Sequence, residues 1–145
     1  PEFQTYIKNV LANAKMLAET LKNNGFKIYS GGTDTHLMLV DLRPFGVKGN
    51  IASESLCRAN ITCNKNGIPF DTEKPMITSG IRLGSQAATT RGFGLKEFEK
   101  VGELITKVIK GLSKNPEDNS QIEEEVRKEV IDLCSSFPIY KNLNR

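Results

Sequence analysis

The placement of helical periodicity constrains the fold of this chain more than any other feature. Long segments at both ends carry apolar residues at spacings of three and four, whereas the middle holds short apolar segments broken by glycine and proline. In chain order, the expected elements are helices over 2–23, 50–58, 95–112 and from 120 to before Pro138, and strands over 26–29, 36–42, 61–63 and 80–84. This pattern predicts an α+β domain with helices packed on one face of a small, largely antiparallel sheet.

Local signals support the helix boundaries. Gly25 follows two asparagines and is free to adopt the left-handed conformation that stops a helix. Ser120 and Glu123 have the spacing of a capping box at the start of the last helix. The polar segment 64–69 is rich in turn-forming residues, so we expect a turn there.

Length and charge exclude several classes of protein. The 145 residues suit a single domain, 1–145. The 20 Lys and Arg against 17 Asp and Glu give a net charge of +3 without a concentrated basic stripe, so we expect no nucleic-acid partner. No apolar run approaches the roughly 18 residues of a membrane span, so we also expect no membrane association.

The cysteines and the single histidine give no sign of a metal or disulfide site. Cys57, Cys63 and Cys134 fit no disulfide framework or zinc motif, and His36 is the only histidine. We therefore expect no metal, and a reducing compartment, the cytoplasm, is the natural location. A core histidine is the favoured interpretation of His36, ahead of a base or ligand.

Three stretches look unlike scaffolding. Residues 31–36, Gly-Gly-Thr-Asp-Thr-His, suit a tight turn, or else a phosphate cradle that lacks the lysine of a P-loop. Residues 60–66 hold three asparagines, whose amides both donate and accept hydrogen bonds, although a polar turn is favoured. Residues 78–85 place Arg82 between glycines, which suits either a bidentate clamp for a carboxylate or a surface arginine on an edge strand.

Taken together and in order, these segments resemble a known family. The motifs that carry the resemblance are Gly31-Gly32-Thr33-Asp34, Arg58-Ala59-Asn60-Ile61-Thr62, Asn64-Lys65-Asn66, Thr78-Ser79-Gly80-Ile81-Arg82-Leu83-Gly84 and Thr89-Thr90-Arg91-Gly92-Phe93. They are similar to the C-terminal part of serine hydroxymethyltransferase. The resemblance runs from Pro1 to about Tyr140.

The resemblance implies a fold-type I pyridoxal-phosphate enzyme, a transferase that interconverts serine and glycine and passes the one-carbon unit to tetrahydrofolate. In that family a large domain holds the cofactor lysine, and no segment here matches the context of that lysine. The resemblance therefore implies that residues 1–145 are the small C-terminal domain, that its own large domain is its partner, and that the chain alone is inactive. It also implies a cytoplasmic parent enzyme that is a homodimer or homotetramer.

The resemblance assigns roles to individual positions as well. Arg82 matches the arginine that binds the carboxylate of the amino-acid substrate, and Asn66 matches the residue that contacts the folate ring. Lys65, beside Asn66, is a candidate for the anionic glutamate tail of folate. The matching positions that we expect to be structural are Asp34, His36 and Arg91. No catalytic residue is expected within this chain.

Two other kinds of function stay open from the residues alone. The chain suits an autonomous module that binds a small carboxylate without chemistry. It also suits an inert structural fragment whose apolar faces are normally covered by another domain.

Overall fold

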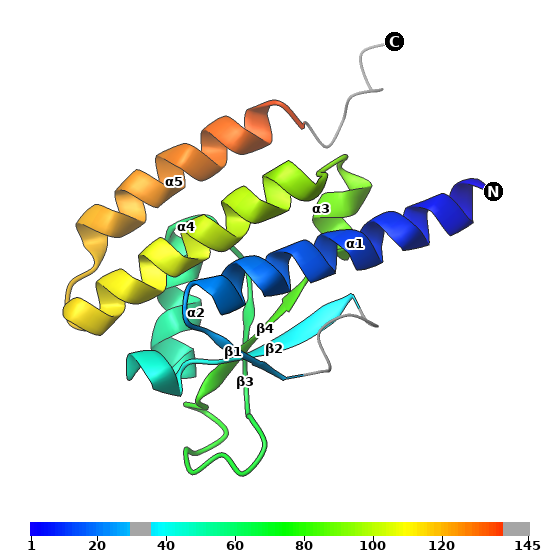
Figure 1. Cartoon of the computed structure of the whole chain (residues 1–145). Coiled ribbons are helices and arrows are strands. Elements are labelled where there is room, and N and C mark those ends of the chain that lie inside the picture. Colours follow the sequence, from blue (N-terminus) through cyan, green and yellow to red (C-terminus); the bar gives the residue numbers. More distant parts are fainter. Residues whose placement is uncertain (30–35, 138–145) are drawn as a thin grey trace.

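The computed structural model describes residues 1–29 and 36–137 of the chain (Figure 1). In chain order, its elements are α1 (Glu2–Asn23), β1 (Lys27–Tyr29), β2 (Leu37–Asp41), the short 3-10 helix η1 (Arg43–Phe45), α2 (Gly49–Arg58), β3 (Asn64–Asn66), β4 (Gly80–Gly84), α3 (Gln86–Thr90), α4 (Leu95–Lys114) and α5 (Ser120–Ser135). Within these described ranges, no helix combines the length and the apolar character needed to cross a membrane.

The strands form one antiparallel sheet in the order β1-β2-β4-β3. Val40 lies opposite Ile81, and Met38 lies opposite Leu83. These four side chains are buried, and they face the layer of long helices that lies on one side of the sheet in Figure 1. The prediction of helices on one face of a small antiparallel sheet is therefore confirmed.

Helices α1 and α4 run side by side, and α4 lies between α1 and α5 in the helix layer (Figure 1). Leu17 and Leu21 of α1 are buried with Ile105 of α4 in one apolar cluster. The close approach of the two helices depends on Gly102, because a Cβ there would lie 2.7 Å from Thr20 Cγ2. The absence of a side chain at this position therefore sets the distance between α1 and α4.

The predicted helix boundaries are correct at Gly25 and wrong in one detail of α5. Gly25 follows α1 with a φ of 97°, the left-handed conformation that its sequence context predicts. The capping box of Ser120 and Glu123 is not formed, because Asn119 is the N-cap residue and the Ser120 hydroxyl donates to Asp118 Oδ1 at 2.6 Å. The carboxylate of Glu123 instead accepts a hydrogen bond from Arg58 Nε at 2.8 Å, a tertiary contact to the end of α2.

The third strand begins later than its β-branched residues predict. The N–H of Ile61 donates to the carbonyl of Leu56 at 2.8 Å, which closes the end of α2. Asn60 makes this possible with a φ of 67°, so the chain leaves the helix through a left-handed cap residue. Ile61 is therefore used by the end of α2, residues 61–63 form no strand, and the pairing with β4 falls on Asn64–Asn66, which we had expected to be a turn.

A short helix, α3, follows β4 where the sequence predicts no element. The start of α3 is fixed by the buried Ser85, whose hydroxyl donates to the carbonyl of Val10 at 2.8 Å. This contact ties the end of β4 to α1 across 75 residues of sequence. Because the partner is so distant in sequence, no local pattern indicates the helix.

Candidate functional site

The face of the sheet away from the buried strand residues carries Arg82. Side chains alternate along a strand, so Ile81 and Leu83 are buried while Arg82, between them, is exposed on the opposite face. In the register of the sheet, Arg82 lies opposite Leu39 of β2 on one side and Asn64 of β3 on the other. The strand that carries Arg82 is therefore an inner strand, and the alternative of an edge-strand arginine is wrong.

The glycines on both sides of Arg82 are used for close packing on its own face. A Cβ at Gly80 would lie 2.7 Å from Ile68 Cγ2, and one at Gly84 would lie 2.9 Å from Leu37 Cδ2. Side chains of this chain thus take the space that the glycines open. They form apolar walls on the same sheet face before and after Arg82 along the strand.

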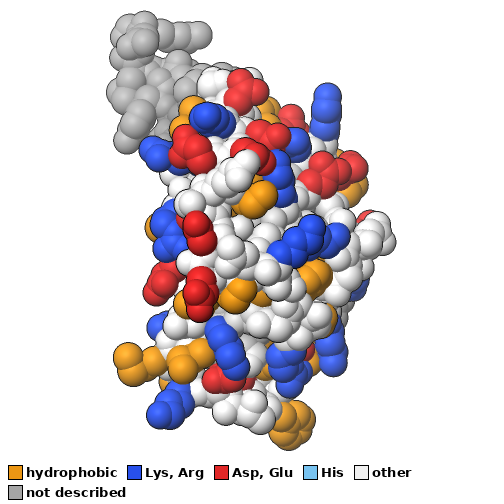
Figure 2. All heavy atoms as spheres, turned by 90° about the vertical axis from the view of Figure 1, so that its left-hand side faces the viewer, with side chains coloured by type: hydrophobic (Ala, Val, Ile, Leu, Met, Phe, Trp, Pro, Cys, Tyr) orange, Lys and Arg blue, Asp and Glu red, His pale blue; other side chains and the backbone are white. Residues whose placement is uncertain are grey.

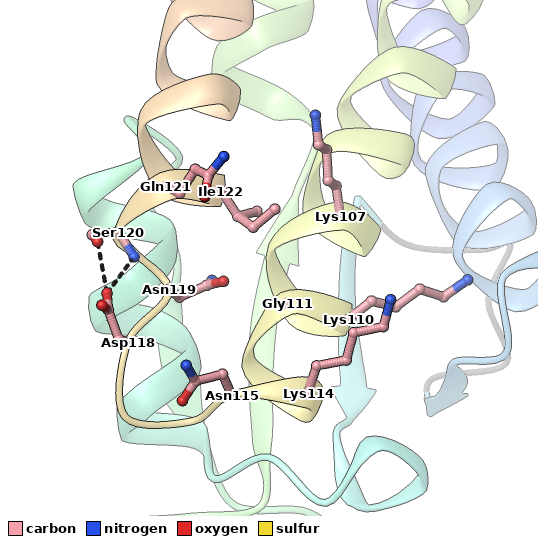
Figure 3. A pocket seen from close by; sticks show the side chains of 10 residues that line it. All are labelled: Lys107, Lys110, Gly111, Lys114, Asn115, Asp118, Asn119, Ser120, Gln121 and Ile122. Atoms are coloured by element: carbon pink, nitrogen blue, oxygen red, sulfur yellow. Dashed lines mark hydrogen bonds between the residues drawn. The ribbon is translucent and has the colours of Figure 1, made fainter.

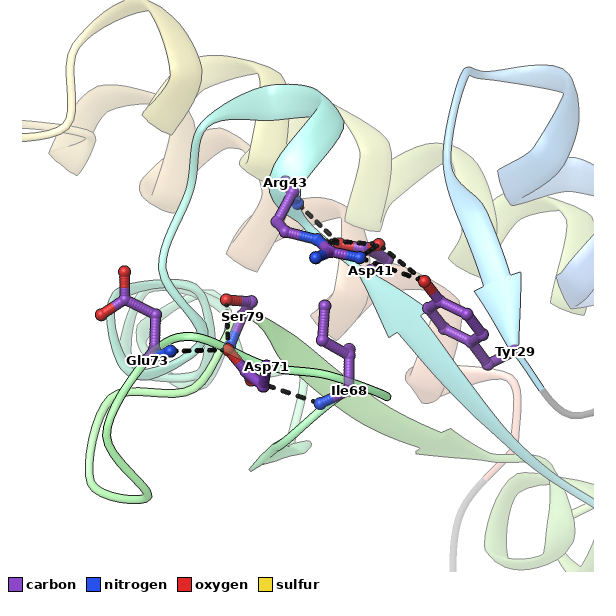
Figure 4. Close-up of polar contacts among 7 residues, drawn as sticks. All are labelled: Tyr29, Asp41, Arg43, Ile68, Asp71, Glu73 and Ser79. Atoms are coloured by element: carbon purple, nitrogen blue, oxygen red, sulfur yellow. Dashed lines mark hydrogen bonds and ion pairs between the residues drawn. The ribbon is translucent and has the colours of Figure 1, made fainter.

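A second arginine, Arg43, forms an ion pair with a carboxylate of the same chain (Figure 4). Its Nη2 donates to Asp41 Oδ2 at 2.8 Å and to the hydroxyl of Tyr29 at 3.1 Å. Burial alone would raise the pKa of Asp41, but the hydrogen bonds and charge of Arg43 outweigh it, so this pKa lies below its usual range. Arg43 is therefore held by a carboxylate that stays ionised at neutral pH.

Arg82 differs from Arg43 in its surroundings. Within residues 1–29 and 36–137, no carboxylate forms an ion pair with Arg82. A guanidinium presents a planar fork of N–H donors that fits a carboxylate with two parallel hydrogen bonds. The site can therefore bind an anionic group from outside the described part of the chain.

Asn66 shares this sheet face and lies one strand away. It is the last residue of β3 and pairs with Gly80, two residues before Arg82. Its side-chain Nδ2 donates to the carbonyl of Gly67 at 2.9 Å. That bond fixes the orientation of the amide and leaves its oxygen as an acceptor.

Lys65 lies on the other face of β3. It pairs with Ile81, whose side chain points into the core, and its ammonium donates to the carbonyl of Met76 at 2.6 Å. The structure therefore brings Arg82 and Asn66 together on one face and places Lys65 on the opposite face of the edge strand β3.

Asp71 is a residue of this region that the sequence analysis missed. It lies in the loop 67–79 between β3 and β4, and its carboxylate accepts four hydrogen bonds from this loop (Figure 4). Burial would raise the pKa of Asp71, but the four donors outweigh it and lower the pKa to about 2. One local signal exists, since an Asp that accepts the N–H two residues ahead is typical of a turn.

The other singled-out residues have structural surroundings or lie outside the described residues. The glycine-rich turn up to Thr35, including Asp34, is outside. His36 is half-buried, and its carbonyl accepts from the N–H of Ser85 at 3.1 Å. Arg91 donates to the carbonyl of Phe137 at 2.8 Å and so holds the segment after α5, a structural role.

Among the described residues, the cysteines and acidic side chains do not form a further chemical centre. Burial and the nearby Cys57 raise the pKa of Cys63 to about 12, which keeps this thiol protonated and unreactive. Among residues 1–29 and 36–137, no group of three His, Cys, Asp or Glu side chains could hold a metal ion.

A separate pocket of about 480 Å³ lies in the helix layer, where α4 ends and α5 begins (Figure 3). Lys107, Lys110 and Lys114 line it from α4, and Lys107 pairs with Glu125 at 3.0 Å. In Figure 3 the ammonium groups of Lys110 and Lys114 point away from the start of α5. The pocket is therefore an open depression between surface side chains, separate from the Arg82 face.

The side of the molecule drawn in Figure 2 shows no concentrated charge of one sign. Figure 2 shows basic and acidic side chains intermixed over one side of the molecule, with hydrophobic side chains projecting at its lower end. The loop between β3 and β4 lies at that end in Figure 1, and its Phe70 and Met76 are 97% and 78% exposed. No single charge type dominates the side in view.

The fold and the Arg82 face together define a class. This is an α+β domain in which helices close one face of a four-stranded sheet, while the other face presents an exposed guanidinium beside an oriented amide.

Comparison with known proteins gives the family. The family model described as serine hydroxymethyltransferase matches residues 1–105. The serine hydroxymethyltransferase of Pelagibacter ubique is 86% identical over 143 residues, which are 99% of this chain and 33% of that protein. Those of Marinomonas sp. and Paramagnetospirillum magneticum are 64% and 62% identical, each over 97% of this chain and 33% of the relative.

The chain therefore belongs to the serine hydroxymethyltransferase family, as the motifs indicate. It spans about a third of the length of the curated relatives it matches. Membership of an enzyme family does not favour the two alternatives, a stand-alone carboxylate-binding module and an inert fragment.

The described lysines do not fit the role of a cofactor lysine. A lysine that forms a Schiff base is normally desolvated in a pocket. Among residues 1–29 and 36–137, every lysine is exposed except Lys107, which is half-buried and paired with Glu125. Within the described part of the chain, no lysine is desolvated in the way that a Schiff-base lysine normally is.

Proposed function

We propose that this chain is the substrate-binding small domain of a glycine hydroxymethyltransferase that interconverts serine and glycine. The observation that carries the proposal is Arg82, an exposed guanidinium on an inner strand without an ion pair among the described residues. The family membership supports the reaction class. Pyridoxal phosphate, bound by the rest of the protein, would serve as the electron sink.

Arg82 would bind the carboxylate of serine or glycine. Two parallel N–H donors fix both the position and the plane of that carboxylate. A fixed carboxylate limits rotation of the substrate about the bond to its Cα, which is an orientation contribution to the rate. The inner strand and the apolar neighbours Ile68 and Leu37 make the sheet a rigid base for the clamp.

Asn66 would contact the ring of tetrahydrofolate. Its amide is already oriented by the bond to Gly67, and a pterin edge offers matching donors and acceptors. Lys65 would meet the anionic glutamate tail, since its ammonium has three N–H donors and gives one to Met76. This role would place the tail at the edge strand β3, on the face opposite Arg82.

The remaining parts of the proposal concern the whole protein. We place the cofactor lysine in its large domain, we expect the 145-residue chain alone to be inactive, and we expect the parent to be a cytoplasmic homodimer or homotetramer. The length of the relatives supports this division, because two thirds of each lie outside the match.

The test is Arg82→Ala in the full-length protein, with steady-state kinetics for serine. Loss of a charge-assisted bidentate contact should lower kcat/KM for serine by about a hundredfold or more. Arg82→Lys keeps the charge but loses the fork, so it should restore only part of the loss. The control is Arg127→Ala, an exposed arginine on α5 that lies 3.9 Å from Glu124 and should leave the kinetics unchanged. Normal turnover by Arg82→Ala would reduce Arg82 to an ordinary strand residue.

A further inference from the structure

The loop 67–79 joins the two residues that the proposed function uses most. β3 ends at Asn66 and β4 begins at Gly80, and these two residues are the last pair of the ladder. Arg82 follows Gly80 by two residues on the same face of the sheet. The geometry of this loop therefore sets how Asn66 and Arg82 lie relative to one another.

The Asp71 carboxylate ties the two ends of the loop together (Figure 4). Its Oδ2 accepts the N–H of Ile68 at 3.2 Å and the N–H of Ser79 at 2.9 Å. Its Oδ1 accepts the Ser79 hydroxyl at 2.8 Å and the N–H of Glu73 at 2.9 Å. One side chain thus bridges the strands directly beyond the Asn66–Gly80 pair, where the backbone ladder stops.

Asp71 also determines where Ile68 packs. Ile68 is 6% exposed, and its Cγ2 lies over Gly80, where it would be 2.7 Å from any Cβ. Gly80 and Arg82 point to the same face, so Ile68 forms the apolar wall next to the guanidinium. The bond from the Ile68 N–H to Asp71 fixes this wall at its backbone.

Loop 67–79 holds two residues in an unfavourable backbone conformation. Phe70 and Thr78 have φ values of 58° and 61°, which are unfavourable for residues with a side chain. Such conformations persist where surrounding contacts over-determine them, and they cluster at functional sites. Phe70 is 97% exposed, so packing of its own side chain does not explain the conformation.

From these contacts we infer that Asp71 is a positioning residue that holds Asn66 and Arg82 in one binding arrangement. The inference rests on the proposed function of those two residues. All four hydrogen bonds of the Asp71 carboxylate stay within loop 67–79, so its role would be indirect. Asp71 acts through the loop ends, so it affects both binding residues at once.

The experiment compares KM values for two substrates in variants of the full-length protein. Arg82→Ala should raise the KM for serine alone, and Asn66→Ala should raise the KM for tetrahydrofolate alone. Asp71→Asn retains one oxygen acceptor and places an NH2 group against donors, so we expect both KM values to rise by about tenfold or more. Ser79→Ala removes one of the four bonds and should shift both values in the same direction by a smaller factor.

Glu123→Gln is the matched control for a loss of stability. Like Asp71, Glu123 is a carboxylate that accepts several hydrogen bonds, but it is buried on α5 and bonds to Ser55 and Arg58 of α2, away from loop 67–79. This variant should lower the midpoint of thermal unfolding without moving either KM. The inference would be overturned if Asp71→Asn lost as much thermal stability as Glu123→Gln but had the same two KM values as the parent protein.

The design also separates this inference from the function on which it rests. Unchanged kinetics for both Arg82→Ala and Asn66→Ala would remove the proposed function, and the positioning role would fall with it. Altered kinetics for those two variants combined with unaltered KM values for Asp71→Asn and Ser79→Ala would remove only the positioning role. If Asp71→Asn misfolds, Ser79→Ala decides the question, because that variant keeps the carboxylate and all three backbone donors.

Discussion

At the scale of single residues, Glu123 is a buried carboxylate whose charge is matched within the fold. Its oxygens accept from Ser55 Oγ at 2.6 Å and from Arg58 Nη2 at 3.0 Å. Burial alone would raise the pKa of Glu123, but the hydrogen bonds from Arg58 and Ser55 outweigh it and lower the pKa. The ionised carboxylate therefore links α5 to the end of α2.

This linkage predicts a pH-dependent loss of stability. A folded-state pKa below the ordinary 4.5 means that ionised Glu123 stabilises the protein at neutral pH, and that this contribution is lost as the pH falls through the folded pKa. Glu123→Gln should lower the free energy of unfolding by about 2 kcal/mol at pH 7. Urea titrations should show this difference narrowing below pH 4.5.

The neighbouring Glu124→Gln is the control for that measurement. Glu124 is exposed and lies 3.9 Å from Arg127, a surface pair that should contribute less than about 1 kcal/mol. A difference between Glu123→Gln and the parent that stays constant down to acid pH would contradict the assigned role.

The residues of the candidate site could be predicted from the sequence only in part. Arg82 stood out because glycines flank it, and the alternation along β4 does expose it. Asp71 did not stand out, because three of its four donors belong to Ile68 and Ser79, which meet only when the loop closes. A carboxylate in a polar segment gives no sign of the number of donors that the folded chain will bring to it.

At the scale of elements, the contact between α1 and α4 depends on Gly102. Gly102→Ala should raise the intrinsic helix propensity by about 1 kcal/mol. A Cβ there would nevertheless lie 2.7 Å from Thr20 Cγ2 and 3.5 Å from Leu17 Cδ1, so we expect a net loss in thermal stability. Thr20→Ala removes the methyl group at 2.7 Å but keeps the Thr20 Cβ at 2.9 Å, so the double variant should recover only part of the loss that the single effects predict. Additive losses would show that the Thr20 methyl group is not the obstacle.

The element boundaries show where sequence patterns are sufficient. The long helices follow their apolar periodicity because each buries one continuous face. The prediction of a strand at 61–63 is wrong because Asn60 and Ile61 complete the end of α2. In this left-handed cap, the N–H of Ile61 donates to the carbonyl of Leu56 and is not available for pairing with another strand. The short strands of this sheet are thus set by what precedes them as much as by their own β propensity.

At the scale of the whole molecule, the curated relatives are about three times as long as this chain. In Figure 1 the first turns of α1 extend beyond the sheet, and Phe3 and Ile7 there are 73% and 39% exposed. Apolar side chains on one side of a projecting helix favour association when no other domain covers them.

We therefore expect the isolated 145-residue chain to associate in a concentration-dependent manner in sedimentation velocity. Phe3→Ser with Ile7→Ser should shift the distribution towards monomer, because the pair supplies the apolar area at the start of α1. Ile131→Ser is the matched control: this residue is 51% exposed on α5, far from Phe3 in sequence, and its change should leave the association as it was. A monomer at every concentration would contradict this prediction, because it would show that the start of α1 exposes too little apolar area to drive association. In the full-length protein, contacts other than apolar burial would then have to cover this end of α1.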